Sequence, residues 1–118
     1  MPRYEVRELQ KQLKVYADGR YVAALQQGKF RPYIYPVFTP AGHGVTQIAP
    51  ADHLHHLSIW VAHEDVNGID FWTEKKGNGV IVHDGFDEIT SGEEGVIRCR
   101  NLWKSTAGDV ILTDERTY

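Results

Sequence analysis

The 118-residue chain has little of several features that mark particular classes of protein. Its single cysteine, Cys99, excludes an internal disulfide and a zinc site built from cysteines. Cys99 lies in an alternating segment, so we expect a partly buried strand thiol there and not a nucleophile. So little cysteine use is typical of a reducing compartment, and we expect a cytoplasmic location.

Long apolar runs and an excess of one charge are also missing. No run approaches the ~20 residues that a membrane-spanning helix needs, and residues 1–12 contain no apolar segment typical of a signal peptide. The formal net charge of −3 does not favour a nucleic acid or an anionic membrane as a partner. The length suits one domain, and 42% hydrophobic with 25% charged residues is ordinary globular usage.

Strand signals dominate what is present. Residues 4–9 alternate charged and apolar side chains, which is typical of a strand with one wet face. Asp18-Gly19 between two such runs predicts a hairpin with a type I′ turn. Three prolines predict an edge strand or extended loop over residues 29–40, whereas the apolar residues 57–62 predict an interior strand. Further strands are expected at 80–83, 88–90, 95–103 and 109–113.

Turn signals separate these short strands about every ten residues. This spacing is typical of an antiparallel all-β meander, which forms a β-sandwich or barrel. Residues 109–118 read as a strand, a turn and the start of another strand. We therefore expect residues 1–118 to be a single β-sheet domain that is part of a longer sheet protein.

The chemistry-bearing residues gather between Asp52 and Glu74. Four of the six histidines lie in this segment. On a regular strand His53 and His55 would point to one face and His56 to the other, with His63 sharing the first face. Imidazoles that converge in this way suit either a metal ion or proton transfer. Asp70 and Glu74 follow closely enough to orient or share a proton, and Trp72 could line a pocket beside them.

Four blocks of the sequence resemble the signature blocks of the PmoA-like family. They are Arg-Pro-Tyr at 31–33 with Thr-Pro-Ala-Gly at 39–42, Asp-His-Leu-His-His at 52–56, Asp-Val-Asn-Gly-Ile-Asp-Phe-Trp at 65–72, and residues 108–118. This bacterial family is often labelled "methane oxygenase PmoA" or left as a domain of unknown function. Leu54 departs from it, because the family usually has proline there. Family members are longer, so the resemblance implies that this chain is the N-terminal portion of such a protein.

The resemblance implies a galactose-mutarotase-like β-supersandwich, a fold that acts mainly on carbohydrates. The leading hypothesis is therefore a carbohydrate-active isomerase, lyase or hydrolase. Its acid–base residues would be His53, His55, His63, Asp70 and Glu74, with His55 as the principal acid or base. Its substrate contacts would be Arg31, His56, Asn67 and Trp72.

Two alternatives stay open. A metal-dependent oxidoreductase or metal-binding protein would hold a divalent metal through His53, His55 and His63. A non-catalytic domain would bind carbohydrate or form homo-oligomers through an unpaired strand edge.

Overall fold

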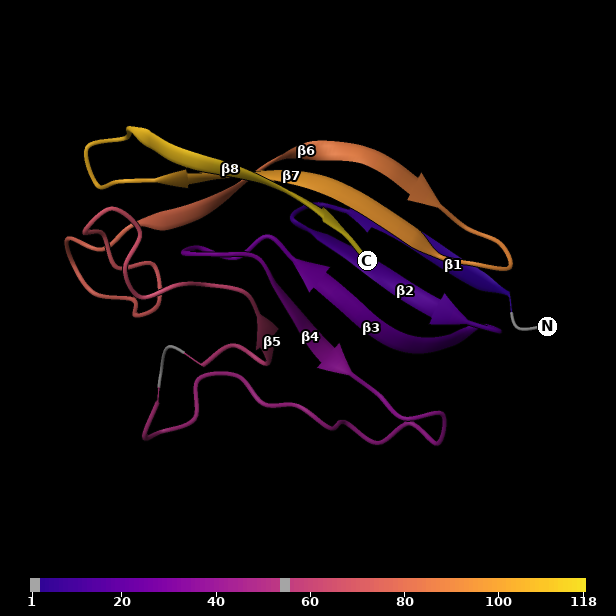
Figure 1. Cartoon of the computed structure of the whole chain (residues 1–118). Coiled ribbons are helices and arrows are strands. Elements are labelled where there is room, and N and C mark those ends of the chain that lie inside the picture. Colours follow the sequence, from indigo (N-terminus) through magenta and orange to yellow (C-terminus); the bar gives the residue numbers. More distant parts are fainter. Residues whose placement is uncertain (1–2, 54–55) are drawn as a thin grey trace.

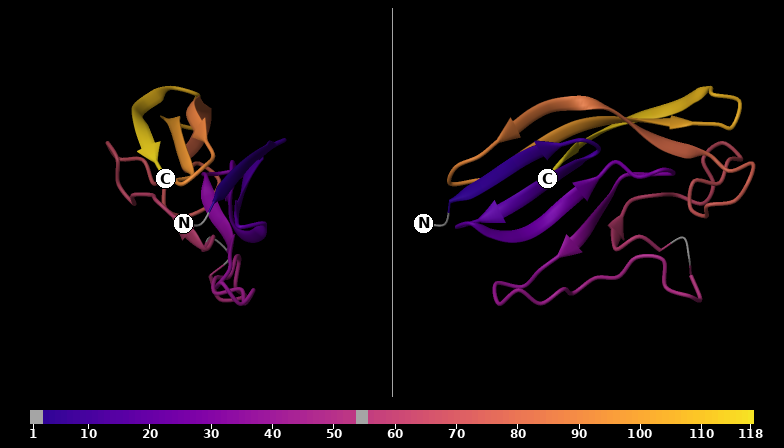
Figure 2. Two further views of the ribbon diagram at one scale, coloured as in Figure 1. Left: turned by 90° about the vertical axis from the view of Figure 1, so that its right-hand side faces the viewer. Right: turned by 180° about the vertical axis from the view of Figure 1, so that it is seen from behind.

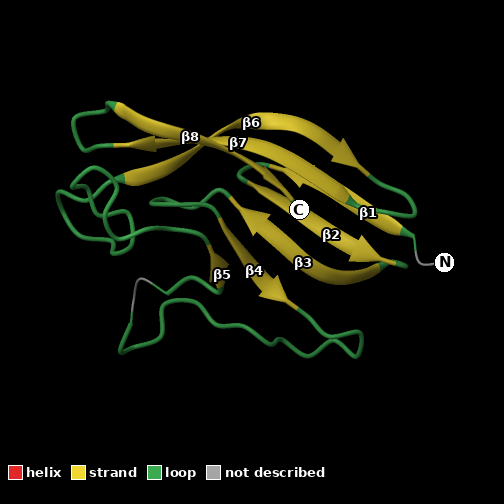
Figure 3. Ribbon diagram, viewed as in Figure 1, coloured by secondary structure: helices red, strands yellow, loops and turns green. Residues whose placement is uncertain are grey.

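The computed structural model describes residues 3–53 and 56–118, and within them all regular structure is β (Figure 3). The strands form two sheets with the orders β1-β2-β3-β4-β5 and β6-β7-β8, and every pairing is antiparallel (Figure 1). The antiparallel all-β prediction is confirmed. No helix in these residues is long and apolar enough to cross a membrane. The strands are β1 (Tyr4–Leu9), β2 (Gln12–Ala17), β3 (Arg20–Gln26), β4 (Tyr33–Val37), β5 (Ile59–Trp60), β6 (Val80–Thr90), β7 (Val96–Lys104) and β8 (Val110–Thr117).

Local turn chemistry builds the first sheet. Asp18 and Gly19 have φ values of 50° and 79°, the positive pair that a type I′ turn requires, and they join β2 to β3 as predicted. β1 has the predicted bounds, and Lys11, with φ 64°, lies in the tight turn before β2. A register shift between Val15 and Tyr16 places a bulge in this hairpin.

The second sheet contains longer strands than the sequence predicts. Residues 80–83 and 88–90 are not separate strands, because β6 runs without a break from Val80 to Thr90. Two register shifts, on either side of Phe86, let the strand continue past Gly85. Within the described chain β8 pairs with β7 alone, and association through such an edge stays a prediction.

The two sheets pack face to face as separate layers (Figure 2). Leu13 and Leu25 of the first sheet meet Ile97 of the second in the main core cluster. A backbone bridge between Tyr4 and Gly92 joins β1 to the β6–β7 turn, with N···O distances of 2.6 and 2.8 Å. Cys99 is also buried, and burial raises the pKa of its thiol. The residue lies on strand β7, as expected, and its raised pKa disfavours the reactive thiolate.

A second core cluster fixes the long segment that connects β5 to β6. Phe71 is 1% exposed and packs against Ile81 and Trp103, with the Phe71 and Trp103 ring centroids 5.0 Å apart. The indole Nε1 of Trp103 donates to Asp114 at 2.7 Å, and Arg116 donates to the same carboxylate at 2.8 Å. Burial opposes ionisation of Asp114, but these hydrogen bonds outweigh it and lower its pKa.

Two strand predictions are wrong. Residues 57–62 do not form an interior strand, because only Ile59–Trp60 is a strand, at the end of the sheet, while Leu57 makes an isolated bridge to Ile48. Ile59 and Val61 are about half exposed. The proline-bearing strand is not an edge strand over its whole length either, because the start of β4 lies between β3 and β5. The β4–β5 pairing covers only Tyr33 and Ile34, however, so it ends before Pro36, whose nitrogen has no hydrogen to donate.

Candidate functional site

His53 and His56 lie in a loop and not on a regular strand. The His53 N–H donates to Pro50 O at 2.9 Å, and the His56 N–H donates to His53 O at 3.0 Å, so the chain turns here. The rings of His53 and His56 stack with centroids 4.5 Å apart and planes 11° from parallel. The prediction that His56 faces away from His53 is therefore wrong, because alternation applies only to extended backbone. His55 lies outside the described residues.

A carboxylate lies beside this histidine pair. His53 Nδ1 is 3.1 Å from Asp52 Oδ2, and both side chains are more than half exposed. A backbone hydrogen bond and the His53 ring lower the pKa of Asp52. The Asp52 carboxylate is thus placed to orient the His53 imidazole at the protein surface.

Two tryptophans meet next to the histidines. The rings of Trp60, on β5, and Trp72, in the following loop, are 4.5 Å apart at an interplanar angle of 55°. The centroids of the His56 and Trp60 rings are 6.2 Å apart. Trp72 is 40% exposed, so the pair presents aromatic surface to solvent, as the pocket-lining prediction for Trp72 requires.

Arg31 supports this pair from within the protein. Its side chain is 1% exposed, and its guanidinium carbon lies 4.6 Å from the centroid of the Trp60 ring. Its Nη2 donates to the Trp72 carbonyl oxygen at 2.6 Å, and its Nη1 lies 3.4 Å from Glu74 Oε1. A side chain buried in this way supports the two tryptophans from below. Substrate contact by Arg31 stays a prediction.

An open groove of about 600 Å³ runs past these aromatic residues. Its lining combines aromatic, imidazole and hydroxyl groups from the loop after β4 and from β5. The lining residues are Thr46, Gln47, Pro50, His56, Ser58, Ile59, Trp60 and Trp72.

Two hydroxyl groups of this lining have unusual surroundings. Thr46 Oγ1 and Ser58 Oγ are buried and have no hydrogen-bond partner within residues 3–53 and 56–118. Ser58 also has a φ of 61°, a left-handed conformation that costs a non-glycine residue roughly 1–2 kcal/mol. Unsatisfied hydroxyls and backbone strain often occur together at binding sites.

Asp70 and Glu74, the two carboxylates predicted to take part in acid–base chemistry, have different surroundings. Asp70 accepts hydrogen bonds from the Trp72 N–H at 2.6 Å and the Thr73 hydroxyl at 2.9 Å. Burial opposes ionisation of Asp70, but these hydrogen bonds outweigh burial and lower the pKa of its carboxyl group. Asp70 therefore stays ionised, and its hydrogen bonds hold the conformation of its own loop. Glu74, whose side chain is 22% exposed, faces Arg31 instead.

His63 and Asn67 lie outside the groove lining. The Asp65 N–H donates to His63 Nδ1 at 3.2 Å, which engages one imidazole nitrogen within its own loop. Asn67 and Gly68 form a tight turn with φ values of 53° and 82°, closed by mutual backbone hydrogen bonds between Val66 and Ile69. His63 and Asn67 are not among the residues that line the groove shared by His56 and Trp72.

The described residues contain no group of three or more His, Cys, Asp or Glu side chains that could hold a metal ion. Of the three predicted ligands His53, His55 and His63, His55 lies outside the described residues. Metal binding by these histidines therefore stays a prediction.

Sequence reasoning missed most of the groove. Thr46, Gln47 and Ser58 carry no motif, and only their approach to Trp60 and Trp72 in the folded chain identifies them. The unusual density of histidines next to an Asn-Gly turn was the signal that pointed to this region.

Comparison with known proteins gives one match. No curated protein and no solved structure matches the sequence. A family model, described as a family of unknown function (DUF6807), matches residues 12–118, which is nearly the whole chain. The chain therefore belongs to the family of unknown function DUF6807.

Proposed function

We propose that this protein binds a carbohydrate in the groove between Trp60, Trp72 and His56 and catalyses proton transfer on it. The observation that carries the proposal is the Trp60–Trp72 pair, exposed at an open groove and supported by a buried arginine. A pyranose has an apolar face of C–H groups that packs on an aromatic ring, and a rim of hydroxyls that needs polar partners. The groove supplies both kinds of group.

The polar rim has candidate partners on the groove wall. Gln47 offers an amide, while Thr46 and Ser58 have the hydroxyls without partners in the described chain. A sugar hydroxyl, or a water molecule that it holds, would satisfy such groups, because unsatisfied polar atoms gain most from a new hydrogen bond. This combination favours a polyhydroxylated ligand over a wholly apolar one.

The stacked histidines supply the acid–base chemistry. Histidine is the side chain that most often serves as a general acid or base, so His53 or His56 could remove a proton from a sugar carbon or hydroxyl and return one elsewhere. Epimerisation needs only such proton transfers. In ring opening and elimination one group removes a proton while another protonates the oxygen of the C–O bond that breaks. The assignment of His55 as the principal acid or base stays part of this proposal, as does the resemblance to PmoA-like and galactose-mutarotase-like proteins.

Sugar binding is tested by titrating the purified chain with neutral monosaccharides and disaccharides while tryptophan fluorescence is followed. We expect a saturable change in emission, because two of the three tryptophans lie at the groove. Trp72→Ala should weaken binding at least about tenfold, and Trp72→Phe should retain most of it, since a ring remains to stack. Equal affinity of Trp72→Ala and the native chain would contradict the proposed site.

Catalysis is tested separately, in D₂O, by following anomer interconversion and deuterium incorporation into a bound sugar by proton NMR. We expect rates above those of buffer alone, and a loss of that excess in the His53→Ala, His55→Ala and His56→Ala variants. Sugar binding without any excess rate would show that the domain is a non-catalytic carbohydrate-binding module.

A further inference from the structure

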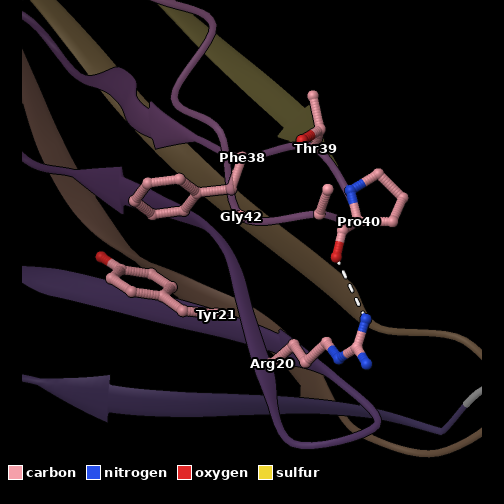
Figure 4. Close-up of a pocket in the computed structure, with 7 residues that line it drawn as sticks. Arg20, Tyr21, Phe38, Thr39, Pro40 and Gly42 are labelled. Atoms are coloured by element: carbon pink, nitrogen blue, oxygen red, sulfur yellow. Dashed lines mark hydrogen bonds between the residues drawn. The ribbon is translucent and has the colours of Figure 1, made fainter.

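A second pocket lies away from the groove, at a corner of the first sheet. It is formed by the start of β3, just after the β2–β3 turn, and the loop that follows β4 (Figure 4). Its volume is about 500 Å³, within the range of small-molecule sites. The residues that carry the argument are Arg20, Tyr21, Phe38, Thr39 and Pro40. None of them lines the tryptophan groove.

One wall of the pocket is aromatic. The rings of Tyr21 and Phe38 are 5.3 Å apart and tilted by 60°, and Figure 4 shows them side by side at one end of the pocket. Tyr16 extends the wall along the sheet, with its ring 5.4 Å from that of Tyr21. Tyr21 and Phe38 are partly exposed, so part of each ring can contact a ligand.

The other end of the pocket carries a positive charge. The exposed Arg20 guanidinium donates from Nη1 to the Pro40 carbonyl oxygen at 3.1 Å, which holds it at the rim (Figure 4). Within the described chain no carboxylate lies within 4.0 Å of it, and the adjacent Asp18 accepts the Arg3 N–H at 2.9 Å instead. A guanidinium has five N–H donors in a planar fork, so most of those of Arg20 stay available.

A second cation lies over one ring of the aromatic wall. Lys14 Nζ is 5.2 Å from the centroid of the Tyr21 ring. The neighbouring Arg7, by contrast, is paired with Glu5 at 2.6 Å, so its charge is neutralised. Two cationic side chains, Arg20 in the pocket lining and Lys14 over the Tyr21 ring, therefore lie close to the aromatic wall.

The loop that closes the pocket is held by its own hydrogen bonds. The Thr39 N–H donates to His43 O at 2.9 Å, and the Gly42 N–H donates to Thr39 O at 2.9 Å. The Phe38 N–H donates to Val22 O at 2.8 Å, which ties the loop to β3. The pocket is thus formed before a ligand arrives, and binding need not order it.

We propose that this pocket is a second binding site, which takes a uronic-acid residue of an acidic saccharide. The sugar ring would lie against Tyr21 and Phe38, and its carboxylate would accept a forked pair of hydrogen bonds from Arg20. One guanidinium at the rim matches a singly charged carboxylate better than a doubly charged phosphate. A carboxylate without a ring would leave the aromatic wall unused, and a neutral sugar would leave Arg20 unused.

The test is isothermal titration with a galacturonic-acid trisaccharide and, in parallel, with a neutral galactose trisaccharide. Arg20→Gln should weaken binding of the acidic trisaccharide at least about tenfold, because a charge-assisted pair of hydrogen bonds is lost, and Phe38→Ala should weaken it similarly. Arg98→Gln is the matched control, since Arg98 is an exposed arginine of the second sheet, and it should bind as the native chain does.

The outcomes separate this site from the tryptophan groove. Binding of the acidic trisaccharide that survives Trp72→Ala and falls with added salt would support the second site. Equal affinity of Arg20→Gln and the native chain would overturn the proposal, as would equal affinity for the acidic and neutral trisaccharides. Loss of acidic-trisaccharide binding in Trp72→Ala but not in Arg20→Gln would assign it to the groove, and would also overturn the proposal.

Discussion

Replacement of Arg31 by methionine tests whether a buried cation holds the two groove tryptophans. Methionine has a similar length and fills the space without charge, so the change removes mainly the polar contacts. Those contacts include the 2.6 Å hydrogen bond to the Trp72 carbonyl, the 3.4 Å pair with Glu74, and the cation–π contact with Trp60 at 4.6 Å.

The expected cost follows from these contacts. A hydrogen bond from a charged donor contributes about 1.5–3 kcal/mol, and a desolvated cation–π contact contributes about 2 kcal/mol. Glu74 is 22% exposed, so water can solvate its carboxylate after the change and limit that part of the loss. Relief of the desolvation of Arg31 and the packing of the methionine offset part of the sum. We therefore expect the free energy of unfolding to fall by about 2–4 kcal/mol.

Urea denaturation measures this loss, and at about 1–3 kcal/mol per molar of urea the midpoint should fall by roughly 1–2 M. Circular dichroism adds a second measurement, which reports the relative orientation of the two tryptophan rings and not the overall stability. Two indole rings 4.5 Å apart couple their electronic transitions, so native Trp60 and Trp72 should give an exciton couplet. Loss of their fixed orientation in Arg31→Met should shrink this signal.

Arg98→Met is the matched control. Arg98 pairs with Glu88 at 3.8 Å, and both side chains are more than a third exposed. Such a surface pair contributes about 0–1 kcal/mol, so this variant should keep its urea midpoint nearly unchanged and its couplet intact. The reasoning would be refuted if Arg31→Met lost no more stability than Arg98→Met, or if its couplet were unchanged.

Two further changes test the second core cluster and the second sheet. Gly79→Ala should lower the free energy of unfolding by about 1–3 kcal/mol, because a Cβ there would overlap the buried Phe71 ring. Gly44→Ala, whose nearest neighbour would be 3.8 Å away, should change it by less than about 0.5 kcal/mol; equal urea midpoints of the two variants would contradict this account. Burial in the folded chain lowers the pKa of His83 below its ordinary value of 6.5. As the pH falls, His83 therefore becomes protonated in the unfolded chain before it does in the folded chain, and the free energy of unfolding should fall below pH 6.5. His83→Phe keeps a ring against Phe86 but cannot take up a proton, so its urea midpoint should fall less than that of the native chain between pH 7.5 and 5.5. An equal fall in the two midpoints would contradict the proposed effect of His83 on stability.

Local signals predicted much of the first sheet. The Asp18-Gly19 turn and the alternation of residues 4–9 depend only on neighbouring residues, so the sequence alone reveals them. The histidine-rich segment could not be predicted in the same way. Its apolar neighbours suggested an extended strand, but Pro50 and the loop after β4 turn the chain and stack His53 on His56.

The amino-acid sequence by itself determined the antiparallel all-β class, the positions of the tight turns and the region where a site should be sought. These depend on side-chain alternation and on residues that tolerate positive φ, which are properties of short segments. Only the tertiary structure decided the membership of the groove. The meeting of Trp60 with Trp72 depends on the path of the loop after β5, and the burial of Arg31 beneath them depends on packing against a segment far from both in the chain. Long-range packing of this kind leaves no periodic signal in the sequence.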